Sequence, residues 1–246
     1  MNLILVEAHE LDGHGAVSLR DHRADHARSV LRVAAGDRLR VGLLDGPLGD
    51  ARVTSVSPAG VGLQCTFADA APPRSDDTLL LGVPRPRVLR RCLEDATALG
   101  FGRIVLLRTW RVDKSHLHSA AMQPPRQRAW LLAGLAQARR TRLPEIVVEP
   151  LFKPFVEDRL DALVPPDNRF VADPSAATAL VAATVVAAPL TLAIGPERGF
   201  LPYEIEALGA RGFVAVHAGR QPLRVETALA NLHGRLALLR ERTALQ

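Results

Sequence analysis

From residue 78 to the C-terminus, short apolar runs alternate with longer amphipathic stretches. The apolar runs have the length of buried strands, and the stretches between them have the length and periodicity of helices. Strands are expected at TLLLGV (78–83), RIVLL (103–107), EIVVEP (145–150), RFVAD (169–173), LTLAIG (190–195) and FVAVHAG (213–219), and helices at about 87–99, 124–140, 202–212 and 225–242. This alternation predicts an α/β domain with a largely parallel sheet, in which ligands bind at the carboxyl ends of the strands.

The first 72 residues have a different pattern, mostly short strand-like runs separated by turns. The runs are NLILVEA (2–8), DRLRVGLLDG (37–46), DARVTSVSP (50–58) and GVGLQCTFA (60–68), with one helical stretch at 21–36. Turn signals at Asp45-Gly46 and Pro58-Ala59-Gly60 separate them, and this pattern predicts a small β-barrel. The Pro-rich, acidic segment 68–77 is typical of a linker, so we expect two domains, residues 1–72 and 73–246.

The chain carries a formal net charge of +5, and Lys114 and Lys153 are its only lysines, so arginine dominates. Guanidinium groups suit phosphates and stack on bases, which favours a nucleic-acid partner over a coding bias toward Arg, Ala, Leu and Pro. Two regions are candidates for that contact: the first helical stretch with Arg20, Arg23, Arg28 and Arg32, and RTWRVDKSH (108–116) with Arg111 and Lys114 around Trp110. For both regions the alternative is a solvated charged face, with Trp110 in the core.

Neither the cysteines nor the apolar segments indicate export or membrane insertion. Cys65 and Cys92 are isolated, without metal-ligand spacing or a disulfide framework, which fits a reducing cytoplasm. The start, MNLILVEAHE, lacks the basic region of a signal peptide. Residues 174–196 carry no charge, but Pro174 and Pro189 interrupt them. We therefore expect a buried helix followed by a buried strand, and no membrane span.

Two loops follow predicted strands and are candidates for ligand binding. Gly195–Leu201 reads GPERGFL, and His217–Arg224 reads HAGRQPLR. Glycines let a backbone approach a ligand closely, but the spacing matches neither the dinucleotide fingerprint GxGxxG nor a P-loop. Because the loops flank a single helix, we expect them to close on one ligand. Glu226 lies in the first turn of the next helix, and its spacing alone leaves open whether it complements the helix dipole or takes part in chemistry.

Longer motifs around these loops resemble those of a known family. LTLAIGPERGFLPYEIEAL and the downstream GFVAVHAGRQPLRVETA are similar to the paired signature of the RsmE-type ribosomal RNA methyltransferases of the SPOUT class. That signature is G-P-E-G-G-F followed by L-G-x-R-I-L-R-x-E-T-A. LLLGVPRPRVLRRCLEDATALGFGRIVLL, RTWRVDKS, GLAQARRTRLPEI and FKPFVEDRL also resemble family segments, so the similarity covers nearly the whole chain.

The resemblance implies a PUA-like RNA-binding β-barrel, followed by a SPOUT methyltransferase domain whose parallel sheet is tied in a trefoil knot. It also implies S-adenosylmethionine as cofactor, a cytoplasmic homodimer, and methylation of N3 of a uridine in small-subunit (16S) ribosomal RNA. The cofactor-binding residues expected from it are Ala172, Gly195, Glu197, Gly199, His217, Ala218, Gly219, Leu223 and Thr227. Glu197 has two open roles, a hydrogen bond to a ribose hydroxyl or support of the second loop.

Catalysis is expected at Arg224, which would stabilise the uridine anion. Glu226 is a weaker candidate for a base, because an exposed carboxylate needs a raised pKa for that role; the alternatives are orienting Arg224 or capping the helix. The RNA-binding candidates are Arg20, Arg23, Arg28, Arg32, Arg111 and Lys114. No metal site is expected, since His217 and His233 lack companions at metal-ligand spacing.

Four positions depart from the family pattern. Arg198 replaces a glycine, Ala136 replaces a glutamate, and Gln221 and Pro222 replace an Arg-Ile pair. These changes bear more on substrate positioning and rate than on cofactor binding. Two other functions stay open: a non-catalytic RNA-binding or ribosome-assembly protein with the same fold, and a SPOUT enzyme that methylates a ribose 2′-hydroxyl, against which the RVETA motif argues.

Overall fold

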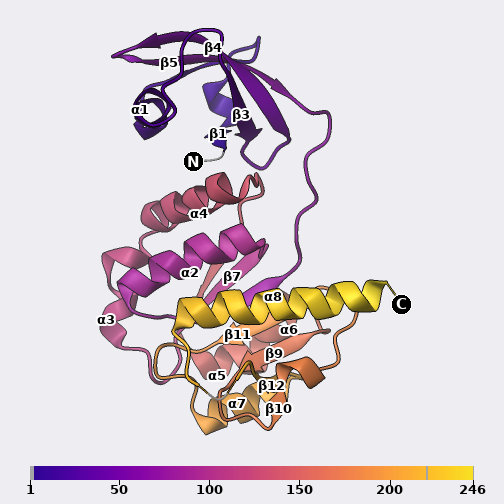
Figure 1. Cartoon of the computed structure of the whole chain (residues 1–246). Helices are drawn as coiled ribbons and strands as arrows, with labels where there is room; N and C mark the ends of the chain where they lie inside the picture. The colour runs from indigo at the N-terminus through magenta and orange to yellow at the C-terminus, as the bar shows by residue number, and fades with distance from the viewer. Residues whose placement is uncertain (1–2, 220, 246) are drawn as a thin grey trace. The chain divides into compact units, whose positions relative to one another are not determined.

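Figure 1 shows the chain as a computed structural model, which describes residues 3–219 and 221–245. The chain divides into two compact units. The first unit contains Met1–Arg74 together with Leu132–Leu143, and the second contains Ser75–Leu131 and Pro144–Gln246. The helix α4 (Pro124–Ala138) therefore contributes residues to both units.

The first unit is built on one curled sheet of five strands. The strands are β1 (Ile4–Val6), β2 (Ala16–Leu19), β3 (Arg38–Leu43), β4 (Leu48–Ser57) and β5 (Gly60–Phe67), in the order β1-β3-β4-β5-β2. β1 pairs with β3 in parallel, and the other pairs are antiparallel. A bulge between Val53 and Ser55 bends β4. Among the described residues β1 and β2 form the two unpaired edges, so the predicted barrel is an open half-barrel of the PUA-like kind.

The helix α1 (His22–Ser29) is shorter than the predicted stretch 21–36. The Asp21 side chain caps its first turn by accepting a hydrogen bond from the Arg23 amide at 2.9 Å. Arg32 has a φ of 55°, a left-handed conformation that ends the helical path and lets Val33 enter the core. A 3₁₀ turn at Ala8–Glu10 connects β1 to the segment before β2.

The C-terminal half of α4 completes the first unit. Leu135 and Ala136 are buried in one apolar cluster with Leu3 and Leu5. A glutamate at position 136, as in the family motif, would place a carboxylate inside this cluster at a desolvation cost. Packing therefore explains the alanine at this position.

In the described part of the second unit, seven strands form a fully parallel sheet. These are β6 (Thr78–Gly82), β7 (Arg103–Leu107), β8 (Glu145–Glu149), β9 (Arg169–Ala172), β10 (Thr178–Ala179), β11 (Thr191–Ile194) and β12 (Val214–His217). Their order is β10-β12-β9-β11-β6-β7-β8. The α/β prediction and its six strands are confirmed; β10, at two residues, is too short to carry a sequence pattern.

Helices cover both faces of this sheet (Figure 1). α2 (Pro86–Leu99) and α8 (Val225–Ala244) pack against each other on one face. The other face is covered by α7 (Pro202–Gly209) and by a helical segment made of α5 (Phe152–Pro154), a π-turn (Phe155–Arg159) and α6 (Leu160–Leu163). The remaining short elements are α3 (Lys114–Leu117) and 3₁₀ turns at Ala120–Met122 and Leu180–Ala182. None of the helices in the described part of the chain is long and apolar enough to cross a membrane.

The buried helix expected at the start of segment 174–196 is wrong, whereas the buried strand after it, β11, is confirmed. Residues 183–190 follow an irregular path. The Asn168 side chain holds that path: its amide donates to the carbonyls of Val186 and Ala188, both at 2.9 Å, and its oxygen accepts from the Val186 amide at 2.9 Å. The β-branched run Thr184-Val185-Val186 is a poor helix former, so these outside contacts decide the conformation.

Candidate functional site

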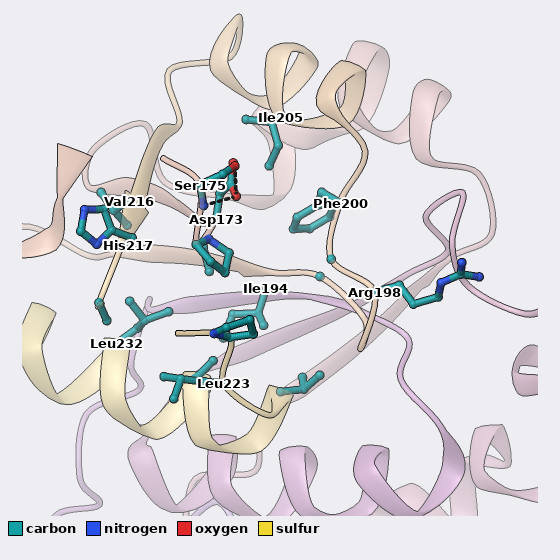
Figure 2. A pocket seen from close by; sticks show the side chains of 18 of the residues that line it. Asp173, Ser175, Ile194, Arg198, Phe200, Ile205, Val216, His217, Leu223 and Leu232 are labelled. Atoms are coloured by element: carbon teal, nitrogen blue, oxygen red, sulfur yellow. Dashed lines mark hydrogen bonds between the residues drawn. The ribbon is translucent and has the colours of Figure 1, made fainter. Parts of the chain in front are cut away.

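A cavity of about 700 Å³ lies at the carboxyl ends of β9, β11 and β12 (Figure 2). We call it the strand-end cavity. It is lined by residues 172–175, 194–200, 216–219 and 221–223, and by Arg111, Pro202, Ile205, Glu206, Val225, Ala228 and Leu232. The register pairs Val171 with Ala193 of β11 and with Ala215 of β12, so the three strands end side by side. The structure thus brings together the two loops identified in the sequence and adds a third, after β9.

The glycines of the first loop are needed for two different reasons. A Cβ atom on Gly195 would lie 2.8 Å from the carbonyl carbon of Gly199 and 2.9 Å from the Phe200 amide nitrogen, both backbone atoms of the same loop. Gly199 has open space around it but a φ of 67°, which other residues rarely adopt. Its amide donates to the Pro196 carbonyl at 2.7 Å and closes the turn. The loop is therefore folded tightly on itself before any ligand is considered.

The second loop also contains a glycine with positive φ. Gly219 has a φ of 134°, and its amide donates to Nδ1 of His217 at 3.3 Å. The walls around it are largely apolar, with Ile194, Phe200, Ile205, Val216, Leu223 and Leu232 seen around the cavity in Figure 2. Such walls, close to exposed backbone of the loops, suit a flat heterocycle whose edge hydrogen-bonds to main-chain groups.

The predicted residues divide into a group that lines the strand-end cavity and a group that does not. The first group consists of Ala172, Gly195, Glu197, Gly199, His217, Ala218, Gly219 and Leu223. Gln221 and Pro222, two of the departures from the family pattern, also line the cavity. Thr227, Arg224 and Glu226 do not belong to its lining. Glu197 accepts a hydrogen bond from the Arg85 amide at 2.9 Å, so it supports the start of α2, a role the sequence did not suggest.

Arg224 and Glu226 have different surroundings. Arg224 is exposed directly before α8, and its guanidinium has no hydrogen-bond or ion-pair partner among the described residues. Glu226 is 15% exposed at its side chain and pairs with Arg91 of α2, Oε1 to Nη1, at 3.2 Å. Glu226 thus links the first turn of α8 to α2. Burial, with nearby Glu94 and Glu226, raises the pKa of Asp95 beside this pair.

A second cavity, of about 560 Å³, adjoins the first and shares Arg111, Glu197 and Arg198 with it. We call it the Trp110 cavity. Its lining consists of Arg85, Trp110, Arg111, Val112, Asp113, His116, Glu197, Arg198 and Leu201. Trp110 is 77% exposed, so the alternative in which it lies in the core is wrong. Lys114 is exposed at the start of α3 but does not line the cavity.

Two side chains connect the loops: Glu204, which was not identified from the sequence, and Arg111, which was predicted to bind RNA. Glu204 is fully buried and accepts from the Trp110 amide at 2.8 Å and from the Leu201 amide at 2.7 Å. The Arg111 guanidinium donates to the carbonyls of Arg198 and Phe200. The segment around Trp110 is therefore fastened to the loop Gly195–Leu201 from both sides. Only the position of Glu204, at the start of a predicted helix, offered a signal.

Asp173 is a further polar group in the strand-end cavity that the sequence argument missed. One of its oxygens accepts from the amide of Ser175 at 2.9 Å and from its hydroxyl at 2.7 Å (Figure 2). Its place at the carboxyl end of a strand was a usable signal, since acids there often bind sugar hydroxyls. Among the described residues there is no group of three or more His, Cys, Asp or Glu that could hold a metal ion.

The predicted RNA-binding arginines of the first unit differ in availability. Arg23 pairs with Glu10 and Asp21, and Arg28 pairs with Asp25. Arg20 and Arg32 are exposed and have no such partner in the described part of the chain. The sheet also carries two exposed arginines that the sequence argument did not select, Arg38 of β3 and Arg52 of β4, which face each other across the ladder. Like charges directly opposite are unfavourable without a counter-charge, which makes this pair a candidate for phosphate contact.

The chain matches the family model described as "RNA methyltransferase domain" over residues 72–237. It is 33% identical to the ribosomal RNA small subunit methyltransferase E of Treponema pallidum (strain Nichols), covering 95% of this chain and 92% of the relative. A protein of the same name from Mycobacterium tuberculosis (strain CDC 1551 / Oshkosh) is 29% identical, over 93% of this chain and 88% of the relative.

Solved structures show the same fold. A structure of ribosomal RNA small subunit methyltransferase E from Neisseria gonorrhoeae, bound to S-adenosylmethionine, superposes with a TM-score of 0.74 at 20% identity, over 100% of this chain and 98% of that one. A protein from Legionella pneumophila in complex with the same cofactor has a TM-score of 0.75 at 20% identity, with 96% and 97% coverage. The SPOUT fold is therefore confirmed. By its family model and its relatives, the chain belongs to the ribosomal RNA small subunit methyltransferase E family of RNA methyltransferases.

Proposed function

We propose that the chain transfers a methyl group from S-adenosylmethionine to N3 of a uridine in small-subunit ribosomal RNA. Family membership supports the reaction class, and the names of the relatives support the substrate. The observation in this chain that carries the proposal is the strand-end cavity, because both motif-bearing loops form its wall.

The strand-end cavity fits S-adenosylmethionine in size and chemistry. Its volume lies in the range of about 300–1,000 Å³ that is usual for small-molecule sites. Gly199 and Gly219 bring loop backbone to the cavity without side chains, and backbone groups beyond the strand ends need new partners, which an adenine edge provides. Ile194 and Leu223 would flank the purine, and Asp173 would accept from a ribose hydroxyl. The cofactor supplies a methyl group already activated on a sulfonium.

The protein's contribution to the chemistry is positioning and charge stabilisation. Uridine N3 carries a proton near neutral pH, and that proton must leave to solvent as the new N–C bond forms and the S–C bond breaks. We assign to Arg224 the stabilisation of the negative charge on O2, N3 and O4, because its guanidinium is uncommitted and sits where the second loop meets α8. We assign to Glu226 a positioning role, since it is held by Arg91.

The remaining parts of the proposal concern the assembly. We assign RNA binding to a first domain, residues 1–72, and catalysis to a second domain, residues 73–246. In the second domain we expect the two loops to be part of a trefoil knot. Arg20, Arg32 and Lys114 are exposed and would contact RNA phosphates. We further propose that the protein is a cytoplasmic homodimer. Light scattering at micromolar concentration tests this, and a monomer mass would contradict the proposed dimer.

The deciding experiment is single-turnover transfer from labelled S-adenosylmethionine to small-subunit RNA between pH 6 and 10, followed by nucleoside analysis. The expected product is 3-methyluridine. Arg224→Ala should lower the rate by roughly 10²-fold, with partial rescue at high pH and little change in cofactor affinity. Arg224→Lys should recover less than its charge suggests, because an ammonium cannot bridge two acceptors as a guanidinium does. A 2′-O-methyl product, or cofactor binding without transfer, would replace the proposal by one of its alternatives.

A further inference from the structure

We propose that the Trp110 cavity binds an unpaired nucleotide of the RNA next to the methylated one, with its base stacked on Trp110 and its phosphate held by Arg85 and Arg198. The inference rests on the proposed function, because it assigns the adjoining nucleotide of the same substrate. The two cavities share the residues Glu197 and Arg198, so ligands in them would lie on either side of one loop.

Trp110 is an exposed side chain on a fixed backbone. Its amide is held by the buried carboxylate of Glu204, and the next residue, Arg111, is bonded to two carbonyls of the neighbouring loop. Val112 is buried directly after them. The indole is therefore presented to the cavity without further ordering of the main chain. A rigid aromatic face of this kind favours base stacking, which accepts any base.

Guanidinium groups outnumber carboxylates in the lining of the Trp110 cavity, with Arg85, Arg111 and Arg198 against Glu197 and Asp113. Arg85 and Arg198 are exposed, and neither guanidinium has a partner among the described residues. The two carboxylates in the lining are engaged: Glu197 accepts from the Arg85 amide and Asp113 from the Ser115 amide. Two free guanidinium forks beside an aromatic face match a phosphate and its base.

The geometry also explains why position 198 carries arginine where the family motif has glycine. In Figure 2 the Arg198 side chain points away from the apolar walls of the strand-end cavity. Arg198 lines both cavities, but its guanidinium is directed away from those walls, and its charge is added to the Trp110 cavity. Only an unstacked base can reach Trp110, so the occupant is a single-stranded nucleotide rather than a duplex.

The experiment uses the full chain with Trp130→Phe, which leaves Trp110 as the only tryptophan. The probe is a uridine hexanucleotide, titrated by tryptophan fluorescence, with an abasic hexamer as the matched ligand. We expect the uridine hexamer to quench Trp110, and the abasic hexamer to bind more weakly with little quenching. Trp110→Ala should weaken binding about tenfold, and Trp110→Phe should retain most of the affinity.

Charge is tested in the same assay at several salt concentrations. Arg85→Gln and Arg198→Gln should each lower the slope of log affinity against log salt by up to about 0.7, the contribution of one single-strand phosphate contact. Arg87→Gln is the matched control, because Arg87 is exposed in the first turn of α2, two residues after Arg85, but does not line the cavity. Its slope should stay at the wild-type value.

Methyl transfer then separates this inference from the proposed function. Trp110→Ala and Arg85→Gln should transfer methyl with a higher KM for RNA and an unchanged affinity for S-adenosylmethionine, since neither residue lines the strand-end cavity. If the parent chain methylates RNA but the hexamer neither quenches Trp110 nor loses affinity in Trp110→Ala, the inference is wrong and the proposed function stands. Quenching by S-adenosylmethionine alone would likewise overturn it, since the cavity would then hold the cofactor. Quenching by the hexamer without any methyl product would support the nucleotide site and contradict the proposed reaction.

Discussion

Gly195→Ala is the smallest change that tests the strand-end cavity. The added Cβ would lie 2.8 Å from the carbonyl carbon of Gly199, 2.9 Å from its Cα and 2.9 Å from the Phe200 amide nitrogen. Separations below 3.0 Å are essentially never found for real Cβ atoms, and all three neighbours are main chain, so the loop itself must move. Overpacking of this kind costs about 1–3 kcal/mol.

Because the shifted loop no longer matches the ligand, we expect this cost to appear as a loss of cofactor affinity of about 5- to 150-fold, with the fold retained. Two other glycines serve as controls. Gly199→Ala meets no atom within 4 Å but has a φ of 67°, so only backbone strain of about 1–2 kcal/mol is added. Gly209→Ala lies in α7 with open space around it and should leave affinity unchanged, with a gain in stability of up to about 1 kcal/mol.

The measurement is calorimetric titration of each variant with S-adenosylmethionine, alongside its thermal unfolding. Wild-type affinity in Gly195→Ala would show that the ligand does not depend on this loop, and would move the cofactor site elsewhere. An equal loss in Gly209→Ala would show that the effect is general destabilisation, and would refute the geometric explanation.

Three further predictions concern other parts of the chain. Arg23→Gln should lower the free energy of unfolding by about 2 kcal/mol at pH 7 in chemical denaturation. The hydrogen bond from Arg23 lowers the pKa of Glu10, so this stabilisation is present above the unfolded pKa and is lost as the pH falls through the folded pKa. The difference between the variant and the parent should therefore shrink below about pH 4.5. Equal differences at pH 7 and pH 3 would contradict this. Arg38→Gln with Arg52→Gln should lower the salt slope of RNA binding by about 1.4–1.8, and an unchanged slope would remove this pair from the interface. Burial raises the pKa of Cys65 to about 11, so about one thiol in a thousand is ionised at pH 8, and alkylation should follow unfolding; rapid labelling of the native chain would show an open thiol.

Local pattern was sufficient for most of the secondary structure. The apolar runs at 78–83 and 190–195 became β6 and β11 because uninterrupted apolar residues of that length are buried on both faces of a parallel sheet. Pattern failed for the helical segment Phe152–Leu163, whose π-turn interrupts the regular spacing, and for the region after residue 174. In that region low charge indicated burial, but the side chain of Asn168, 18 residues before Val186, decided the irregular path.

The site divides in the same way. The two loops and their glycines were identifiable because their motifs are contiguous in sequence and follow predicted strands. The reasons why glycine is needed at these positions could not be identified from the sequence. At Gly195 the close approach is to the loop's own backbone, and at Gly199 glycine is required by the left-handed φ.

The sequence by itself determined the parallel α/β architecture, the small β-rich unit and the loops that carry the family motifs, because each of these is written in residues close together in the chain. Only the tertiary structure decided which charges are free. The sequence alone does not distinguish a paired charge from a free one. In the structure Arg23 and Glu226 are paired, whereas the guanidinium groups of Arg198 and Arg224 have no partner among the described residues. Ion pairing depends on distances of a few ångströms between groups far apart in the chain, and local periodicity contains no record of those distances.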